Sequence, residues 1–316
     1  MTNLITMSGF LLVTFSGNPE IEIYRVLFFL VFYLVVLTGN MLIITAISID
    51  RSLHSPMYFL LKHLSFLDLC YITASIPRSI CNSFMHSGSI SLWECILQCF
   101  ALTFSGCAEI AMLIVMSYDT YMAICFPLSY EIIMDTRTCV HGLLAAWTSG
   151  LMVIGFSHAL MHSIMISNLN FCGSNHIHHF FCDVKPLLEL ACKKPQPAEV
   201  TTFLLSVIFL TIPFGLILTS YARILVAVLR VPAGASRRKA FSTCSSHLAV
   251  VSTFYGTLMV LYIAPSAVHS QLLSKIFALL YTVVTPILNP VIYTLRNRDV
   301  HQALWRLLYI KKHRDI

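Results

Sequence analysis

The sequence predicts an all-α membrane protein, a seven-transmembrane helix bundle with a short amphipathic C-terminal helix. Hydrophobic residues make up 57% of the 316 residues and charged residues only 11%, with a mean hydropathy of +0.80. Soluble domains carry about 25% charged residues, so this composition argues against a soluble enzyme, a disordered chain or a secreted mini-protein. The apolar blocks are continuous rather than alternating, which predicts helices, because a segment in lipid must satisfy its own backbone hydrogen bonds.

Hydropathy and helix breakers place seven spans along a single domain that covers residues 1–316. Each span reaches the roughly 20 residues that a membrane helix needs. We expect them at 23–48, 57–80, 92–125, 140–162, 197–228, 239–264 and 272–295, with 1–22 and 296–316 as terminal segments. No internal repeat is visible, so a transporter built from duplicated halves has no support.

A short amphipathic stretch follows the seventh span at about 298–309. Its apolar residues Ala303, Leu304, Leu307 and Leu308 share one helical stripe. This pattern favours a helix on the membrane surface, and an ordinary polar tail is the alternative.

The basic residues indicate which way the bundle faces. Most of the 20 Lys and Arg residues follow the first, third, fifth and seventh spans. The residues in this group are Arg51, Arg137, Arg223, Arg230, Arg237, Arg238, Lys239, Arg296, Arg298, Arg306, Lys311, Lys312 and Arg314. Positive charge stays cytoplasmic, so we expect the N-terminus outside and the C-terminus inside. They form no patch on a soluble module, which argues against nucleic-acid binding despite the net charge of +6.

Four of the 11 cysteines lie in or beside polar loops, and this topology places them on the oxidising side. They are Cys95, Cys172, Cys182 and Cys192, whereas most of the others lie inside apolar blocks. The FLLVTF run near the N-terminus is too short for a signal-peptide core, so the first span is expected to drive translocation.

Asp68, Glu109 and Asp119 are acidic residues that lie within the predicted spans. A charge in hydrocarbon is costly, so such a residue suggests a functional site, although a protonated carboxylate that only joins helices is the alternative. Asp68 and Glu109 fall near mid-span and can share a cation or a proton, with Asn40, Ser65 and Asn289 as further polar members. These residues alone fit a channel, a transporter or a signalling bundle.

The seventh span is interrupted by Pro286 and Pro290, which free backbone carbonyls near Asn289. An interrupted helix beside a polar cluster is suited to move, and a static kink is the alternative.

Seven motifs then occur in a familiar order. They are GN (Gly39–Asn40), LHSPMYFLLKHLSFLD (Leu53–Asp68), MSYDTYMAIC (Met116–Cys125) with PLSY, SY (Ser220–Tyr221), KAFSTCSSHL (Lys239–Leu248), FYGT (Phe254–Thr257) and PILNPVIYTLRN (Pro286–Asn297). With them the chain resembles a vertebrate olfactory receptor, a rhodopsin-like G-protein-coupled receptor, over essentially its whole length.

The resemblance implies an odorant receptor in the plasma membrane that binds a small volatile and activates a stimulatory G protein to raise cyclic AMP. It implies a mostly apolar pocket at Leu102, Thr103, Gly106, Cys107, Leu205, Ser206, Phe209, Tyr255, Leu258, Met259, Tyr262, Leu279 and Thr282. Tyr262 and Ser206 are the expected hydrogen-bonding groups. No cofactor, metal or catalytic motif is expected, and an ion channel or transporter is the remote alternative.

The resemblance also implies a disulfide between the third span and the following long loop. We expect Cys95–Cys182 and Cys172–Cys192, with Cys95–Cys192 left open. HHFFCD (His178–Asp183) has the residue types of a soft-metal site, but a disulfide at Cys182 would leave no thiolate.

Activation and coupling are assigned by resemblance to Asp68, Glu109, Asp119, Thr120, Tyr121, Tyr221, His247, Asn289, Pro290 and Tyr293. Thr120 stands where the family's DRY motif has arginine, so Asp119, Tyr221 and Tyr293 are expected to lose a partner, and a receptor-like protein with impaired coupling is the second interpretation. The chain also lacks an N-x-S/T sequon, and Glu131 and Asp135 outweigh Arg137 in the second intracellular loop.

Overall fold

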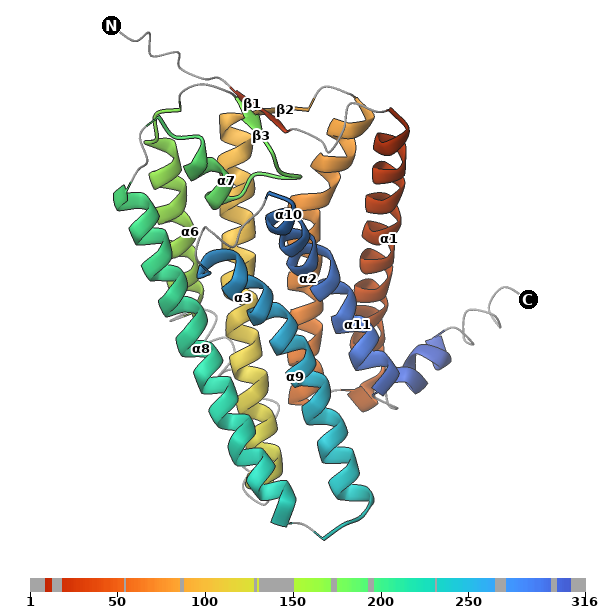
Figure 1. Ribbon diagram of the computed structural model, residues 1–316. Coiled ribbons are helices and arrows are strands. Elements are labelled where there is room, and N and C mark those ends of the chain that lie inside the picture. Colours follow the sequence, from red (N-terminus) through yellow and green to blue (C-terminus); the bar gives the residue numbers. More distant parts are fainter. Residues whose placement is uncertain are drawn as a thin grey trace, which may run out of the picture.

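The computed structural model describes residues 9–12, 19–53, 55–85, 88–127, 130, 151–171, 175–192, 196–230, 232–264, 271–296 and 300–307. Long helices pack side by side into a bundle, and a small sheet covers one end (Figure 1). The helices of the bundle are α1 (Pro19–Ile49), α2 (Pro56–Phe84), α3 (Leu92–Cys125), α6 (Leu151–Ser167), α8 (Gln196–Arg230), α9 (Ala235–Tyr262), α10 (Gln271–Leu279) and α11 (Thr285–Arg296).

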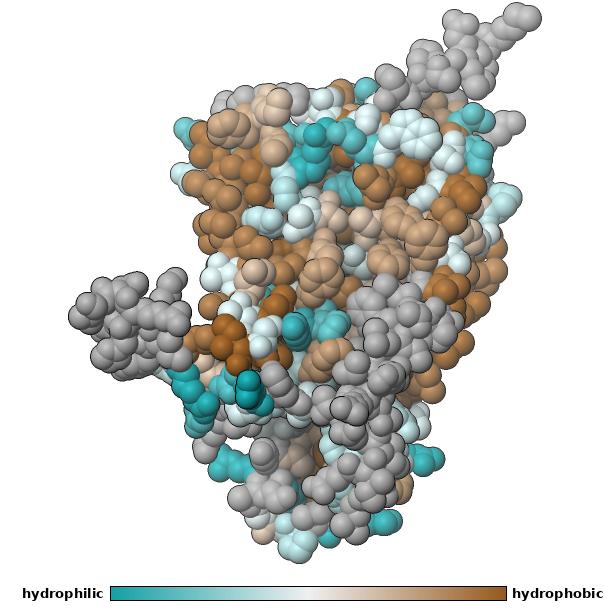
Figure 2. Space-filling view, turned by 180° about the vertical axis from the view of Figure 1, so that it is seen from behind, coloured by the Kyte–Doolittle hydropathy of each residue, from teal (hydrophilic) through white to brown (hydrophobic). Residues whose placement is uncertain are grey.

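Six helices in the described part of the chain are long and apolar enough to cross a membrane. The fourth expected span, 140–162, is represented by α6, and residues 131–150 lie outside the described part. Large apolar side chains such as Leu34 on α1 and Leu216 on α8 are about half exposed on the outside of the bundle. Figure 2 shows hydrophobic residues over much of the sides, as expected for a surface that faces lipid.

The junction between α10 and α11 is a turn of π-helix, Leu280–Val284. Pro290 lies inside α11 and has no N–H, so the carbonyl of Pro286 loses its helical partner. Asn40 Nδ2 donates to this carbonyl at 3.2 Å. A Cβ on Gly39 would lie 3.3 Å from two ring carbons of Pro290. Gly39 therefore leaves room for the Pro290 ring, and Asn40 hydrogen-bonds the carbonyl that the interrupted helix leaves free.

A three-stranded sheet closes the end of the bundle at which the N-terminal segment lies. Strand β1 (Gly9–Leu12) pairs antiparallel with β2 (Ser89–Ser91) and parallel with β3 (His176–Ile177). The expectation of helices alone missed this sheet. Its strands come from three distant parts of the chain and are very short, and so they leave no hydropathy pattern. Phe10 and Ile177 are buried beneath it.

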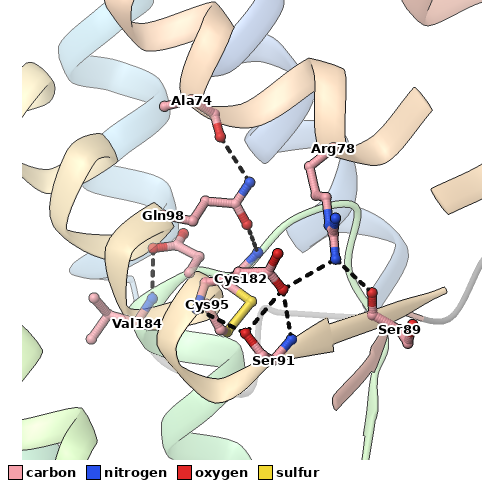
Figure 3. The surroundings of a disulfide bond; sticks show 10 residues. Ala74, Arg78, Ser89, Ser91, Cys95, Gln98, Cys182 and Val184 are labelled. Atoms are coloured by element: carbon pink, nitrogen blue, oxygen red, sulfur yellow. Dashed lines mark hydrogen bonds and ion pairs between the residues drawn. A yellow bond between two sulfur atoms is a disulfide. The ribbon is translucent and has the colours of Figure 1, made fainter. Parts of the chain in front are cut away.

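The Cys95–Cys182 disulfide joins α3 to the loop that precedes the short helix α7 (Val184–Glu189), as expected (Figure 3). Beside it, Gln98 Nε2 donates to the carbonyl of Ala74 on α2, and Gln98 Oε1 accepts from the backbone N–H of Cys182, both at 2.8 Å. Cys192 is disulfide-bonded as well, and its expected partner Cys172 lies outside the described residues.

Helix α3 starts beside this bridge with a capping box. Ser91 Oγ accepts from the backbone N–H of Glu94, whose carboxylate accepts from Ser91 N–H. Glu94 also pairs with Arg78 of α2 at 3.2 Å, and Arg78 donates to the carbonyl of Ser89 at 2.9 Å. The start of α3 is thus fixed to α2, to β2 and to the loop at once.

Replacing Cys95 by serine is expected to lower the free energy of unfolding by about 2–4 kcal/mol, because the bridge restrains a long loop in the unfolded chain. The measurement is thermal unfolding of purified protein, with Cys99→Ser as the control, since Cys99 is a buried free thiol one turn away. Equal destabilisation by both changes would mean that the serine hydroxyl, and not the lost bridge, is responsible.

The C-terminal helix spans 300–307 and leaves the end of α11 at a steep angle to the bundle (Figure 1). Ala303 is buried together with Val300 against α1 and α2, and Leu304 and Leu307 pack on the same cluster. Arg306 pairs with Asp50 at 3.0 Å. The expected apolar stripe therefore packs on the protein, which rules out the polar-tail alternative, while Leu308 lies outside the described residues.

Candidate functional site

A cavity opens among α3, α6, α8 and α9, below α7. The volume of this cavity is about 90 Å³. Eight of the expected ligand residues line it: Leu102, Thr103, Gly106, Cys107, Ser206, Phe209, Leu258 and Tyr262. The other five, Leu205, Tyr255, Met259, Leu279 and Thr282, are not among its lining residues.

Of the five residues outside the cavity, Tyr255, Met259, Leu279 and Thr282 pack into the bundle instead. Tyr255 is fully buried with its ring against Phe214, and the Thr282 hydroxyl donates to the carbonyl of Ala278. A spacing along a helix identifies the inward face, but it does not tell which inward residues reach an open volume and which meet a neighbouring helix.

Asp183 forms a polar roof over the cavity. Both of its carboxylate oxygens lie 2.8 Å from the Tyr262 hydroxyl, which shares its one proton between them. The carboxylate also accepts from the Tyr281 hydroxyl at 3.2 Å and from the backbone N–H of Val184 at 2.7 Å. It follows the disulfide-bonded Cys182 directly and caps α7. The expected recognition hydroxyl of Tyr262 is therefore engaged within the protein.

The segment around Asp183 also carries a buried histidine and a half-buried lysine. Burial lowers the pKa of His179 to about 4, so its imidazole is neutral at physiological pH. Burial also lowers the pKa of Lys185, whose Nζ donates to the carbonyl of Leu261 at 3.0 Å. Because Leu261 lies at the end of α9, this bond ties α7 to that helix.

A chain of nitrogen and sulfur atoms runs along the cavity wall from α3 to α6. Cys107 Sγ lies 3.4 Å from His158 Nδ1, and His158 Nε2 lies 3.1 Å from His162 Nε2. The two histidines are four residues apart and therefore share one face of α6. The His158 ring also stacks on Phe209 of α8 at 4.5 Å between centroids.

A second polar cluster is buried in the middle of the bundle. Asn289 Nδ2 donates to both oxygens of Asp68, at 3.1 and 2.8 Å, which joins α11 to α2. Glu109 of α3 is buried nearby, and its charge interacts with that of Asp68. Ser65 Oγ, Glu109 Oε1, Thr285 Oγ1 and Asn289 Oδ1 have no hydrogen-bond partner among the described atoms. The expectation that this cluster shares a proton or a small cation stays a prediction.

The far end of the bundle holds the residues around Thr120. The Tyr130 hydroxyl donates to the Asp119 carboxylate at 3.0 Å. This hydroxyl stands in for the arginine that a DRY motif would place beside Asp119. Thr120 Oγ1 donates to the carbonyl of Met116 and also bonds to Tyr221.

Thr120 leaves no arginine for Tyr221 to contact, but the Tyr221 side chain has another partner. Its hydroxyl lies 2.5 Å from Nδ1 of the buried His247, a residue known from the sequence only through its motif. Pro290 is buried in α11, and the Tyr121 ring meets Phe126 edge-on. The side chain of Tyr293 lies outside the described part of the structure.

Comparison with known proteins identifies the family. The family model described as "Olfactory receptor" matches residues 29–311. The chain belongs to the olfactory receptor family. It is 54% identical to human "Olfactory receptor 11A1" over 310 residues, which are 97% of this chain and 96% of that protein. It is 46% identical to human "Olfactory receptor 14J1" over 98% of this chain and 94% of that one, and 44% identical to chimpanzee "Olfactory receptor 1E1" over 98% and 97%.

This olfactory receptor is a multi-pass membrane protein and not an enzyme, as members of its family are G-protein-coupled receptors. Odorant ligands and G-protein partners follow from the family in general.

Sequence reasoning missed ten residues that line the receptor's cavity: Tyr71, Ile110, His158, His162, Asp183, Val184, Thr202, Leu210, Phe254 and Tyr281. The spacing of His158 and His162 was a usable signal, since two polar rings on one face of an apolar span are costly without a role. The possible metal site in HHFFCD finds no support, because Cys182 is bonded to Cys95 and the described residues contain no group of three His, Cys, Asp or Glu able to hold a metal.

Proposed function

We propose that this receptor binds small, mostly apolar odorants in the cavity beneath Asp183 and activates a stimulatory G protein to raise cyclic AMP. The observation that carries the proposal is the cavity itself, which is lined mainly by apolar side chains of α3, α8 and α9, with a few hydroxyls and the two imidazoles of α6. Such a lining suits a small ligand with one polar group. We place the receptor in the plasma membrane with the sheet and the disulfide outside, in agreement with its distribution of basic residues.

Affinity is expected to be modest. Burial contributes about 25 cal/mol per Å² of apolar surface, and a small volatile has little surface to bury. Association also costs translational and rotational freedom, so dissociation constants of micromolar or weaker are expected.

The test is an odorant panel applied to cells that express the receptor and a cyclic AMP reporter, with an N-terminal tag read on intact cells to establish orientation and surface delivery. A response that requires the stimulatory G protein supports the proposal. Ion flux without the G protein would favour a channel. A receptor that reaches the cell surface in normal amounts and binds odorants, but raises no cyclic AMP, would favour the second interpretation. In that interpretation, Thr120 impairs coupling.

A further inference from the structure

The two hydroxyls expected to recognise a ligand are both engaged within the protein. Tyr262 donates its hydroxyl proton to Asp183, and the Ser206 hydroxyl donates to the carbonyl of Thr202 at 2.7 Å. A hydroxyl has one proton to give, so neither residue has a free donor for a ligand.

Two other cavity-lining side chains carry polar atoms without a partner. His162 Nδ1 on α6 and Thr202 Oγ1 on α8 are buried and make no hydrogen bond within the described structure. The exposed fractions of the two residues are only 3% and 8%. Buried polar groups are normally paired, and an unpaired one in a cavity wall indicates where a ligand supplies the missing partner.

The hydrogen-bond chain decides what His162 can offer. If the Cys107 thiol donates to His158 Nδ1, then His158 Nε2–H donates to His162 Nε2, and His162 carries its proton on Nδ1. If the chain runs the other way, His162 donates through Nε2, and its Nδ1 is an acceptor. Both arrangements are neutral, so His162 Nδ1 can serve as donor or acceptor, like the Thr202 hydroxyl.

We propose that His162 Nδ1 and Thr202 Oγ1 are the polar recognition groups of this cavity, and that they select apolar ligands carrying one uncharged oxygen over hydrocarbons of the same shape. The inference rests on the proposed function, because it assumes that this cavity is the odorant site. It adds the ligand class and the residues that determine it.

The test is direct binding to purified receptor in lipid nanodiscs, which needs no G protein. The probes are straight-chain alkanes and the alcohols and methyl ketones of the same chain length, and ligand-dependent thermal stabilisation is read over a concentration series. At least one oxygenated probe is expected to bind about tenfold tighter than its alkane, as one hydrogen bond to an otherwise unpaired buried group would give. No advantage for any oxygenated probe would overturn the proposal.

The variants are matched so that packing and hydrogen bonding separate. Thr202→Val keeps the shape and removes the hydroxyl, and Thr202→Ser restores it. His162→Gln keeps a polar atom near the Nε2 position, facing His158, whereas His162→Asn keeps one near the Nδ1 position. Thr202→Val and His162→Gln are each expected to weaken oxygenated probes roughly fivefold and leave alkanes unchanged, with recovery in Thr202→Ser and His162→Asn.

Tyr262→Phe is the control within the same cavity, because it removes a hydroxyl already committed to Asp183. It is expected to shift alkanes and oxygenated probes alike. A selective loss of oxygenated probes in Tyr262→Phe, with none in Thr202→Val or His162→Gln, would overturn the assignment. Cyclic AMP is recorded in parallel, so that selective binding without signalling counts against the proposed function and not against this inference.

Discussion

Thr120→Arg is expected to raise the maximal cyclic AMP response several-fold at matched surface expression, with little change in the concentration that gives half the response. The side chain of Thr120 is short and engaged with Met116 and Tyr221, so it has no charge or reach to offer a G protein. Arginine would supply hydrogen bonds from a charged group, each worth about 1.5–3 kcal/mol. The ligand site lies elsewhere in the bundle, so potency should hardly change.

Two controls separate the charge from the contact with Tyr221. Thr120→Lys restores a cation without the planar guanidinium and is expected to give a smaller rise. Thr120→Val removes only the hydroxyl and tests whether the bond to Tyr221 holds the resting state, in which case basal cyclic AMP rises. An unchanged or lower maximum in Thr120→Arg would mean that the receptor signals by another route.

Asp68→Asn is expected to lower the maximal response roughly fivefold or more, well beyond any loss of surface expression. Asn289 donates to both Asp68 oxygens, and an amide at position 68 offers only one acceptor. The change also removes one of two buried carboxyl groups, and two such groups close together cannot both be ionised without a cost. The remaining carboxyl group would have no partner with which to share a proton or a cation. Because this contact joins α2 to the interrupted helix α11, its loss should disturb the segment that we expect to move during activation.

Glu109→Gln separates charge from packing, since it is nearly isosteric and leaves the bonds between Asp68 and Asn289 in place. Ser65→Ala is the matched control for cavity formation, because Ser65 Oγ is buried and has no partner among the described atoms. Cyclic AMP and surface tag are measured on the same cells. Unchanged signalling in the double variant Asp68→Asn, Glu109→Gln would rule out a functional role for the acidic pair.

The sequence predicted those parts of the fold that rest on local pattern or covalent logic. The helix interruption at Pro290 beside Asn289, the apolar stripe that includes Leu307, and the Cys95 bridge all follow from spacing, residue chemistry or motif. A free carbonyl must be satisfied somewhere, and Asn40 is a polar residue on a mainly apolar helix.

Contacts between distant polar side chains could not be predicted in the same way. Asp183 lies 79 residues from Tyr262. Nothing in the sequence around either residue indicates that the Tyr262 hydroxyl is hydrogen-bonded within the protein. Tyr130 and Asp119 lie 11 residues apart in the sequence, and only the folded chain brings them together. The sheet was not predicted for a related reason, since Phe10 becomes a strand residue only through partners far along the chain.

The π turn at Leu280–Val284 has a consequence for the phase of the helix on either side of it. The N–H of Thr285 bonds to the carbonyl of Leu280, five residues back, so the turn holds one residue more than an α-helical turn. The wider turn absorbs the extra residue. The helical segments before and after it are therefore rotated relative to each other as in a regular helix that is one residue shorter. Chain length can change by one residue within this turn while Asn289 stays aimed at Asp68. The same deletion within α11 would rotate one part of the helix against the other by about 100°.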